Sequence, residues 1–153
     1  MANKPYGRGF YPAKGFEDKV HMLPVRKTPL SAGYDIIAIT DETIEPGETK
    51  LIPTGLKAWM LEDEFLAIYI RSSLAIKRKL ALANSVAIID SDYFENEDND
   101  GHIMLAITNL GDKPWRILMG DRIAQGVFQK WLKSNNDAYP VESRKGGIGS
   151  TGR

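Results

Sequence analysis

The 153-residue chain contains no cysteine, which excludes disulfide bonds and thiolate chemistry. Its 20 Lys and Arg residues balance 20 Asp and Glu residues, so the overall charge offers no electrostatic footprint for duplex nucleic acid. His21 and His102 are the only histidines; they are isolated, with no metal-ligand spacing and no support for Ser-His-Asp catalysis. Any site for a polyanion must therefore be local.

Long apolar runs are also absent. None approaches the ~18 residues that a membrane-spanning helix needs, and the opening "MANKPYGRGF" lacks the apolar core of a signal peptide. A chain without cysteine fits a reducing compartment. We therefore expect a cytoplasmic protein.

Short apolar runs between glycines and prolines predict an all-β domain. The stretch "ETIEPGETKLIPTG" is typical of strand, Pro-Gly turn and strand. The stretch "FLAIYIR" is apolar on both alternating faces, so it predicts a strand buried on both sides, in a sandwich or a subunit contact. Further strands are expected in "HIMLAITNLG" and "RIAQGVFQKW".

The stretch "SSLAIKRKLAL" is the best helix candidate, with about two turns and with Ser72 or Ser73 as the N-cap. We expect one domain over residues 1–132, in which residues 1–20 form an irregular lead-in. Residues 133–153 are polar and rich in glycine, which predicts a flexible C-terminal arm.

The arm ends in "RKGGIGSTGR". A P-loop is excluded, because the chain stops where a helix should follow. Glycine nevertheless lets backbone N–H groups approach an anion closely, and hydroxyl and cationic side chains add donors. The end of the chain is thus either an anion-binding arm or a disordered, solubilising tail; its candidate donors are Arg144, Lys145, Ser150, Thr151 and Arg153.

Two further segments suit phosphate binding and proton transfer. In "YIRSSLA", Arg71 precedes the start of the predicted helix, where an anion could bind; the alternative is a capped helix with a surface arginine. In "NSVAIIDSDYF", Asp90 follows three apolar residues, which makes it a candidate general base. The alternative for Asp90 is an ordinary turn residue.

Three segments place polar residues in other contexts. Asp35 lies at an apolar strand start in "AGYDIIA", and Gln125 lies within the apolar "GDRIAQGVF", where a buried amide needs partners. The segment "ENEDND" is most simply a solvated hairpin tip. It half matches a calcium loop, but Ile107 occupies the position of the required glutamate.

In this order, "AGYDIIA", "RSSLA", "NSVAIIDSDY", "GDRIAQGVF" and "RKGGIGSTG" resemble the five motifs of the trimeric dUTP pyrophosphatases (dUTPases), in a Gram-positive bacterial or prophage-like variant. The resemblance implies a jelly-roll-like β-sandwich with one short helix, and a homotrimer whose active sites are shared between subunits. It also implies attack of water on the α-phosphorus of dUTP, with Mg²⁺ on the triphosphate. The products are dUMP and pyrophosphate, so the reaction would limit uracil in DNA and supply dUMP.

By the same resemblance, Asp90 activates the attacking water, Gln125 helps to hold it, and Asp35 acts on the metal through water. Asn84 and the backbone of Met104 read the uracil edge, and Tyr93 packs on the deoxyribose. The full set of expected substrate-binding residues is Arg71, Ser72, Ser73, Asn84, Ile89, Tyr93, Phe94, Met104, Arg144, Lys145, Gly147, Ile148, Gly149, Ser150 and Thr151.

The chain departs from the family pattern at two informative positions. Ala87 stands where the third motif usually has glycine, which would strain the backbone if φ were positive there. Ile148 stands where the fifth motif usually carries an aromatic residue that covers the uracil. We therefore expect Phe94 to have taken over as the lid on the base; the alternative is a hairpin or core aromatic.

Two other functions compete with dUTP hydrolysis. A dCTP deaminase on the same fold would need a glutamate as proton shuttle, where this chain has Ala106. A binding or regulatory protein on the same fold would carry the same motifs, and "ENEDND" is a surface element suited to such a role.

Overall fold

Short strands joined by turns make up most of the computed structural model, which describes residues 6–140 and 144–148. The prediction of an all-β fold is confirmed. One short α-helix and one 3-10 turn interrupt the strands. In chain order the elements are β1 (Gly9–Pro12), β2 (Tyr34–Ile37), β3 (Glu42–Ile44), β4 (Thr49–Pro53), β5 (Leu56–Trp59), β6 (Glu64–Ile70), α1 (Ser72–Arg78), β7 (Leu80–Leu82), β8 (Ala87–Asp90), η1 (Ser91–Tyr93), β9 (Met104–Asn109), β10 (Trp115–Ile117) and β11 (Arg122–Lys130).

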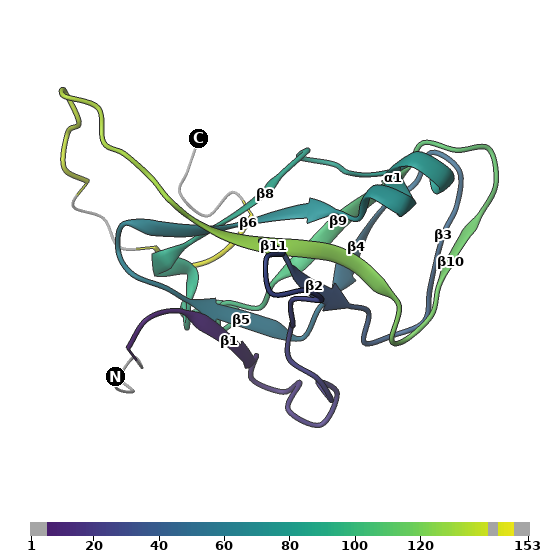
Figure 1. Cartoon of the computed structure of the whole chain (residues 1–153), viewed down its shortest axis with the longest axis horizontal. Coiled ribbons are helices and arrows are strands. Elements are labelled where there is room, and N and C mark those ends of the chain that lie inside the picture. The colour runs from purple at the N-terminus through teal and green to yellow at the C-terminus, as the bar shows by residue number, and fades with distance from the viewer. Residues whose placement is uncertain (1–5, 141–143, 149–153) are drawn as a thin grey trace.

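The strands form two larger sheets and two pairs, all antiparallel. The four-stranded sheet has the order β2-β11-β6-β8, and the three-stranded sheet has the order β4-β9-β7. The pairs are β1-β5 and β10-β3. Figure 1 shows β11 along the length of the molecule, with α1 at one end beside β3 and β10, and with β1 and β5 lower in the view.

One contiguous apolar core joins the sheets. Each sheet and pair contributes buried side chains to it, since alternate residues of a strand point to the same face. The central residues of β6 are buried on both faces, as the sequence predicted. Representative core residues are Phe10, Ile36, Ile44, Ile52, Leu66, Ile68, Leu105, Ile107, Ile117 and Ile123.

The helix differs from its prediction at both ends. Arg71, with φ −65° and ψ 137°, is the N-cap residue, and no side chain caps the helix, so neither serine serves as cap. Lys79 adopts a left-handed conformation with φ 54° and ends the helix, because continuation requires a right-handed residue there. Residues 80–82 of the predicted helical stretch form β7 instead.

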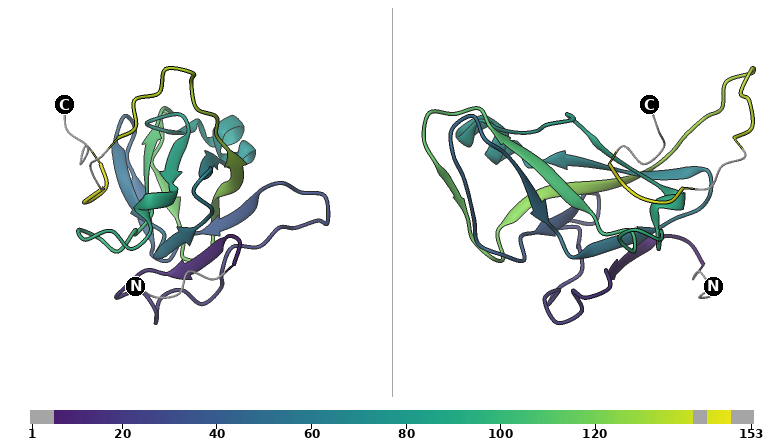
Figure 2. Two further views of the ribbon diagram at one scale, coloured as in Figure 1. Left: turned by 90° about the vertical axis from the view of Figure 1, so that its left-hand side faces the viewer. Right: turned by 180° about the vertical axis from the view of Figure 1, so that it is seen from behind.

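The lead-in contains a strand that the sequence did not predict. In β1, Phe10 pairs with Ala58 of β5 and packs into the core. Figure 2 shows this N-terminal pair along one side of the molecule. In residues 6–140 and 144–148, no helix is long and apolar enough to cross a membrane.

Candidate active site

Strand β8 and the turn after it form one wall of a cavity of about 510 Å³. Ala87 and Ile88 of β8 pair with β6, which holds the strand in register. Ala87 lacks a positive φ, so the expected strain at this position is absent. The cavity is lined by Leu51, Asn84, Ala87, Ile88, Ile89, Asp90, Tyr93, Asp98, Asn99, Ile103, Met104, Ala106, Arg144, Gly147 and Ile148.

The backbone of Met104 points toward this cavity. Ala106 accepts a hydrogen bond from the N–H of Ala83, just past β7. Because alternate residues of a strand direct their N–H and C=O to the same side, Met104 directs its own groups to that side as well. Strand β7 has ended at Leu82, so these groups face the cavity rather than a neighbouring strand.

Hydrogen bonds fix the ring of Tyr93 at the cavity. Its hydroxyl donates to the carbonyl of His102 at 2.8 Å and accepts from the side-chain amide of Asn99 at 2.8 Å. A phenol held at both lone pair and proton cannot rotate freely. The Tyr93 ring is therefore a pre-oriented flat surface.

His102, whose carbonyl accepts the Tyr93 hydrogen bond, is itself held in place. Its Nε2 accepts the N–H of Gly55 at 3.0 Å, and its ring lies 4.3 Å from that of Phe16. Burial lowers the pKa of His102 below its ordinary value. Both features favour the neutral imidazole, because an imidazolium has no lone pair to accept a hydrogen bond.

Asp90 lies at the end of β8 with its side chain 49% exposed, and Arg144 of the arm binds it. The same guanidinium donates through Nε to Asp92 at 2.8 Å. Arg144 also lies over the Tyr93 ring, 5.9 Å from its centre. The described arm residues thus contact the first cavity of their own chain.

The structure separates Phe94 from the cavity. Phe94 packs 6.5 Å from the ring of Trp59, and the ammonium of Lys57 lies over it at 5.1 Å. Ile148 lines the cavity instead. Of these two side chains, the structure thus places Ile148 at the cavity and Phe94 in the hairpin-packing position that was its alternative interpretation.

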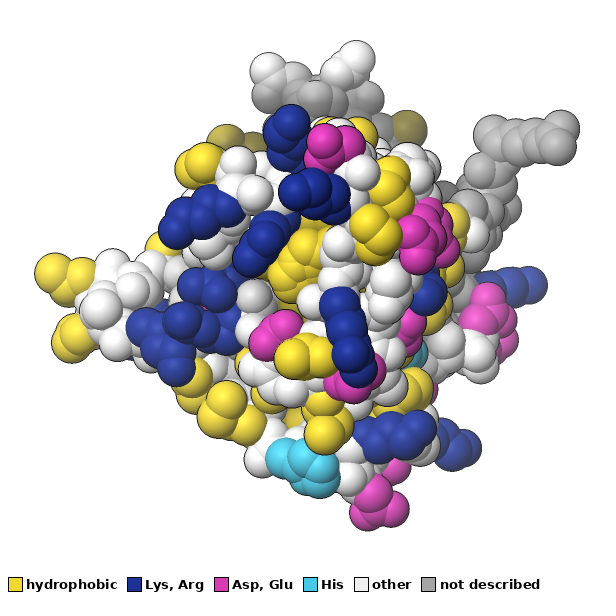
Figure 3. All heavy atoms as spheres, turned by 90° about the vertical axis from the view of Figure 1, so that its right-hand side faces the viewer, with side chains coloured by type: hydrophobic (Ala, Val, Ile, Leu, Met, Phe, Trp, Pro, Cys, Tyr) yellow, Lys and Arg dark blue, Asp and Glu magenta, His cyan; other side chains and the backbone are white. Residues whose placement is uncertain are grey.

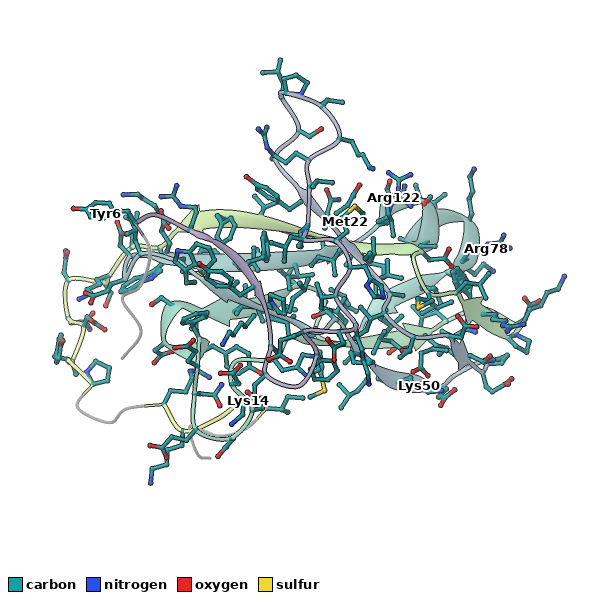
Figure 4. The ribbon with its side chains drawn as sticks, turned by 90° about the horizontal axis from the view of Figure 1, so that it is seen from below. Tyr6, Lys14, Met22, Lys50, Arg78 and Arg122 are labelled. Atoms are coloured by element: carbon teal, nitrogen blue, oxygen red, sulfur yellow. The ribbon has the colours of Figure 1, made fainter. Side chains whose placement is uncertain are left out.

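A second cavity of about 280 Å³ lies at the α1 end and is strongly basic. Figure 3 shows Lys and Arg side chains gathered on this end of the molecule, and Figure 4 shows Arg78 and Arg122 there. Of the two serines that the sequence predicted for phosphate binding, Ser73 lines this cavity. Ser72 is exposed and lies outside the lining. The lining consists of Arg71, Ser73, Leu74, Lys77, Arg78, Trp115, Asp121 and Arg122.

Asp35 and Gln125 lie next to each other near the second cavity. They are paired across β2 and β11, and Arg122 binds the Asp35 carboxylate at 3.2 Å. Gly33 packs directly against the Gln125 side chain, so that a Cβ at Gly33 would overlap the amide oxygen. A side chain at this position would therefore have to displace the Gln125 amide, whereas the backbone conformation itself does not call for glycine.

The two carboxylate regions are far apart within one chain. Along β6, Phe65 pairs with Asp90 and Tyr69 pairs with Gln125, on opposite edges of that strand. Two strand spacings and four residues of strand separate Asp90 from Gln125 by roughly 16 Å. One water molecule cannot contact both residues in the same chain.

Sequence reasoning missed several residues that shape the first cavity. Asp98 and Asn99 fall in a segment that was interpreted as a solvated hairpin tip, and His102 had no pattern to distinguish it. At the second cavity, Arg122 was also missed, although it could have been found because it lies within the fourth motif. Gly149, Ser150, Thr151 and Arg153 lie outside the described residues.

Comparison with known proteins decides the family. The sequence pattern described as dUTPase matches residues 19–152. The chain belongs to the dUTPase family. Among similar dUTPases, the deoxyuridine 5'-triphosphate nucleotidohydrolase of Lactococcus lactis subsp. lactis is 45% identical over 95% of this chain and 97% of its own. The corresponding protein of Haemophilus influenzae is 40% identical over 86% of this chain and 87% of its own.

Solved structures agree on the dUTPase fold. The crystal structure of dUTPase from Streptococcus mutans superposes with a TM-score of 0.77 at 39% identity, covering 84% of this chain and 99% of that one. The dUTPase of Staphylococcus bacteriophage 80alpha has a TM-score of 0.68 at 21% identity, covering 89% of this chain and 98% of that chain. At that identity the likeness extends to the fold alone. The five sequence motifs thus belong to a dUTPase.

Proposed function

We propose that the protein hydrolyses dUTP to dUMP and pyrophosphate by attack of water on the α-phosphorus. The observation that carries this proposal is the first cavity, where a narrow, mostly apolar pocket meets the fixed ring of Tyr93 and the half-exposed carboxylate of Asp90. Membership of the dUTPase family supports the same reaction. We place the reaction in the cytoplasm, where nucleotide pools are maintained.

Base recognition belongs to the part of the first cavity that Asn84 and Met104 line. Asn84 and the cavity-facing backbone of Met104 supply donors and acceptors for the uracil edge, between the apolar side chains of Ala87 and Ile89. The Tyr93 ring packs on the deoxyribose. An added ribose hydroxyl would meet that ring, and the methyl group of thymine would meet the wall, so both nucleotides are excluded by clash.

Asp90 is the group that orients and deprotonates the attacking water. Gln125 and Asp35, which lie beside the second cavity, assist. Because these residues lie roughly 16 Å from Asp90 within one chain, each active site combines Asp90 of one subunit with Gln125 and Asp35 of another. This requirement supports a homotrimer with shared sites.

The triphosphate binds the basic cavity. Arg71 and Ser73 line it, and Ser72 lies next to them at the start of α1. The arm adds Arg144, Lys145 and the backbone of Gly147. Within the described parts of the chain, no group of three or more His, Asp or Glu side chains could hold a metal.

A site with a single carboxylate, Asp35, fits Mg²⁺, because this ion keeps several waters and binds chiefly through substrate phosphates. Asp35 is the carboxylate that would hold it through water. The ion, when bound, neutralises charge that develops on the phosphate oxygens. Ala106 lines the first cavity where a deaminase would need a glutamate, so this structure lacks that proton shuttle.

Pyrophosphate release from dUTP with Mg²⁺ tests the proposal, with UTP, dTTP and dCTP as comparison substrates. We expect release from dUTP alone. Asp90→Asn should lower kcat by about 10²–10⁴ while nucleotide binding persists, because the amide cannot take the proton. Binding of dUTP without release in the unmodified protein would favour a binding or regulatory role; full activity in Asp90→Asn would remove Asp90 from the chemistry.

A further inference from the structure

The loop of residues 95–101, which we call the insert loop, is held together by hydrogen bonds within it. Asn96 is buried, and its side-chain oxygen accepts the N–H groups of Asp98 and Asn99, each at 3.1 Å. Its side-chain nitrogen donates to the carbonyl of Tyr93 at 2.8 Å. Glu95 and Asp100 adopt positive φ, of 56° and 59°. One buried amide thus organises the whole turn.

Strand β5 anchors the insert loop to the body of the protein. The ammonium of Lys57 lies 3.0 Å from the carboxylate of Glu95 and 2.9 Å from that of Asp100. The Lys57 side chain is only 12% exposed, whereas Glu95 is 40% exposed and Asp100 is 23% exposed, so the cation is shielded from water more than its partners are. The loop therefore has a defined conformation, although Glu95, Glu97 and Asp98 are exposed to solvent, as the sequence predicted for this tip.

The arm lies directly on this surface, as Figure 2 shows in its view from behind. The N–H of Asp98 donates to the carbonyl of Lys145 at 3.1 Å. Gly146 is buried, and a Cβ there would overlap the carboxylate of Asp98. A Cβ on Gly147 would lie 3.1 Å from the Tyr93 hydroxyl and 3.5 Å from the amide of Asn99.

We infer that the insert loop is a docking surface for the C-terminal arm, and that Asp98 and Asn99 are positioning residues that set where the arm closes over the bound nucleotide. This inference rests on the proposed dUTP hydrolysis for the identity of the nucleotide. Ordering a glycine-containing segment costs conformational entropy, and a preformed surface that receives it lowers that cost. Asn99 links the docking of the arm to the position of the Tyr93 ring, because its amide also donates to the Tyr93 hydroxyl.

Gly146 offers a steric test. It does not have the positive φ that would itself disfavour alanine, so Gly146→Ala acts only through its methyl group. That methyl group should push the arm off Asp98. Asp98→Ala removes the overlapping carboxylate and should rescue the effect, whereas Glu97→Ala, an equal loss of charge at an exposed position of the same loop, should not.

Trypsin cleavage after Arg144 or Lys145, followed by mass spectrometry, reports arm docking without reference to turnover. It is measured with Mg²⁺ and a non-hydrolysable α,β-imido analogue of dUTP. We expect Gly146→Ala to be cleaved about tenfold faster than the unmodified protein, with a higher KM for dUTP. In the Asp98→Ala, Gly146→Ala double variant, the cleavage rate should fall most of the way back to that of the unmodified protein. In the Glu97→Ala, Gly146→Ala double variant, cleavage should stay as fast as in Gly146→Ala.

Two results would overturn the inference: protection of Gly146→Ala equal to that of the unmodified protein, or equal cleavage of Gly146→Ala with and without Asp98→Ala. Failure of the proposed function would look different, because the unmodified protein would then release no pyrophosphate from dUTP.

Discussion

Ile148 and Phe94 differ in what their side chains contact. Ile148 lines the first cavity yet is 84% exposed in the free chain, so a bound base could bury it. Ile148→Ala should therefore raise the KM for dUTP about tenfold, with little change in thermal stability. Steady-state kinetics and a melting curve measure both effects.

Phe94→Ala provides the contrasting variant. Its ring packs against Trp59 and Lys57, so its loss should lower the free energy of unfolding by about 1–2 kcal/mol, less than for a fully buried ring. Its KM should change less than that of Ile148→Ala. If instead Phe94→Ala raises KM more, Phe94 covers the base despite its position here.

His102 makes stability depend on pH. Its pKa is lowered by burial in the folded chain, so the unfolded chain binds the proton more readily. Stability is therefore full above the ordinary histidine pKa and falls as pH drops below it toward the folded value. His102→Gln keeps an acceptor for the N–H of Gly55 but cannot titrate. Urea unfolding between about pH 7.5 and 5 should show a weaker pH dependence in this variant; equal slopes would contradict the assignment.

Strand β1 is held by an ion pair as well as by its partner strand. Arg8 donates through Nε to Glu64 at 2.8 Å, and the Glu64 side chain is only 4% exposed. Arg8→Met should cost about 1–3 kcal/mol of unfolding free energy, because it leaves a buried carboxylate with too few donors. Denaturant unfolding measures the loss. Arg116→Met is the matched control, since its pair with Asp41 is exposed and should contribute little.

The same pair gives that loss a defined pH dependence. The hydrogen bond from Arg8 lowers the pKa of Glu64 although burial opposes the shift. The stabilisation is present above the ordinary glutamate pKa and disappears as pH falls through the folded value. The difference between the unmodified protein and Arg8→Met should therefore shrink in acid. A constant difference down to about pH 3 would show that Arg8 acts through packing alone.

Strands with strong local patterns were predictable, and elements that depend on distant partners were not. β6 was visible because both of its faces are apolar. β1 was missed because "GFYP" has no alternation of its own and becomes a strand only by pairing with β5. The end of α1 depends on a left-handed Lys79, which a helix-forming sequence does not reveal.

The site divides in the same way. Asp90, Tyr93 and Asn84 could be named from their motif, and the structure brings them to one cavity. The direction of Phe94 could not, because it is set by the fold of the insert loop and by contacts with Trp59. The role of Asn96 as the buried centre of that loop also has no sequence signal, since "ENEDND" is uniformly polar.

Within one chain, the proposed site residues form two separate groups. The first cavity holds Asp90 and the proposed base-binding residues, and the basic cavity lies close to Gln125 and Asp35. The extent of β6 keeps Asp90 and Gln125 roughly 16 Å apart. The central claim is therefore that a working site takes Asp90 from one chain and Gln125 from another.

Mixing two inactive variants tests that claim most directly. One chain carries Asp90→Asn, and the other carries Arg71→Ala and Gln125→Ala; the two are unfolded together, refolded at equal concentration and assayed for pyrophosphate release from dUTP. Shared sites predict that about a quarter of the sites in randomly mixed trimers combine unmodified residues and regain activity. Mixed trimers as inactive as either parent would contradict the account, because Asp90 and Gln125 would then have to serve the same site from the same chain.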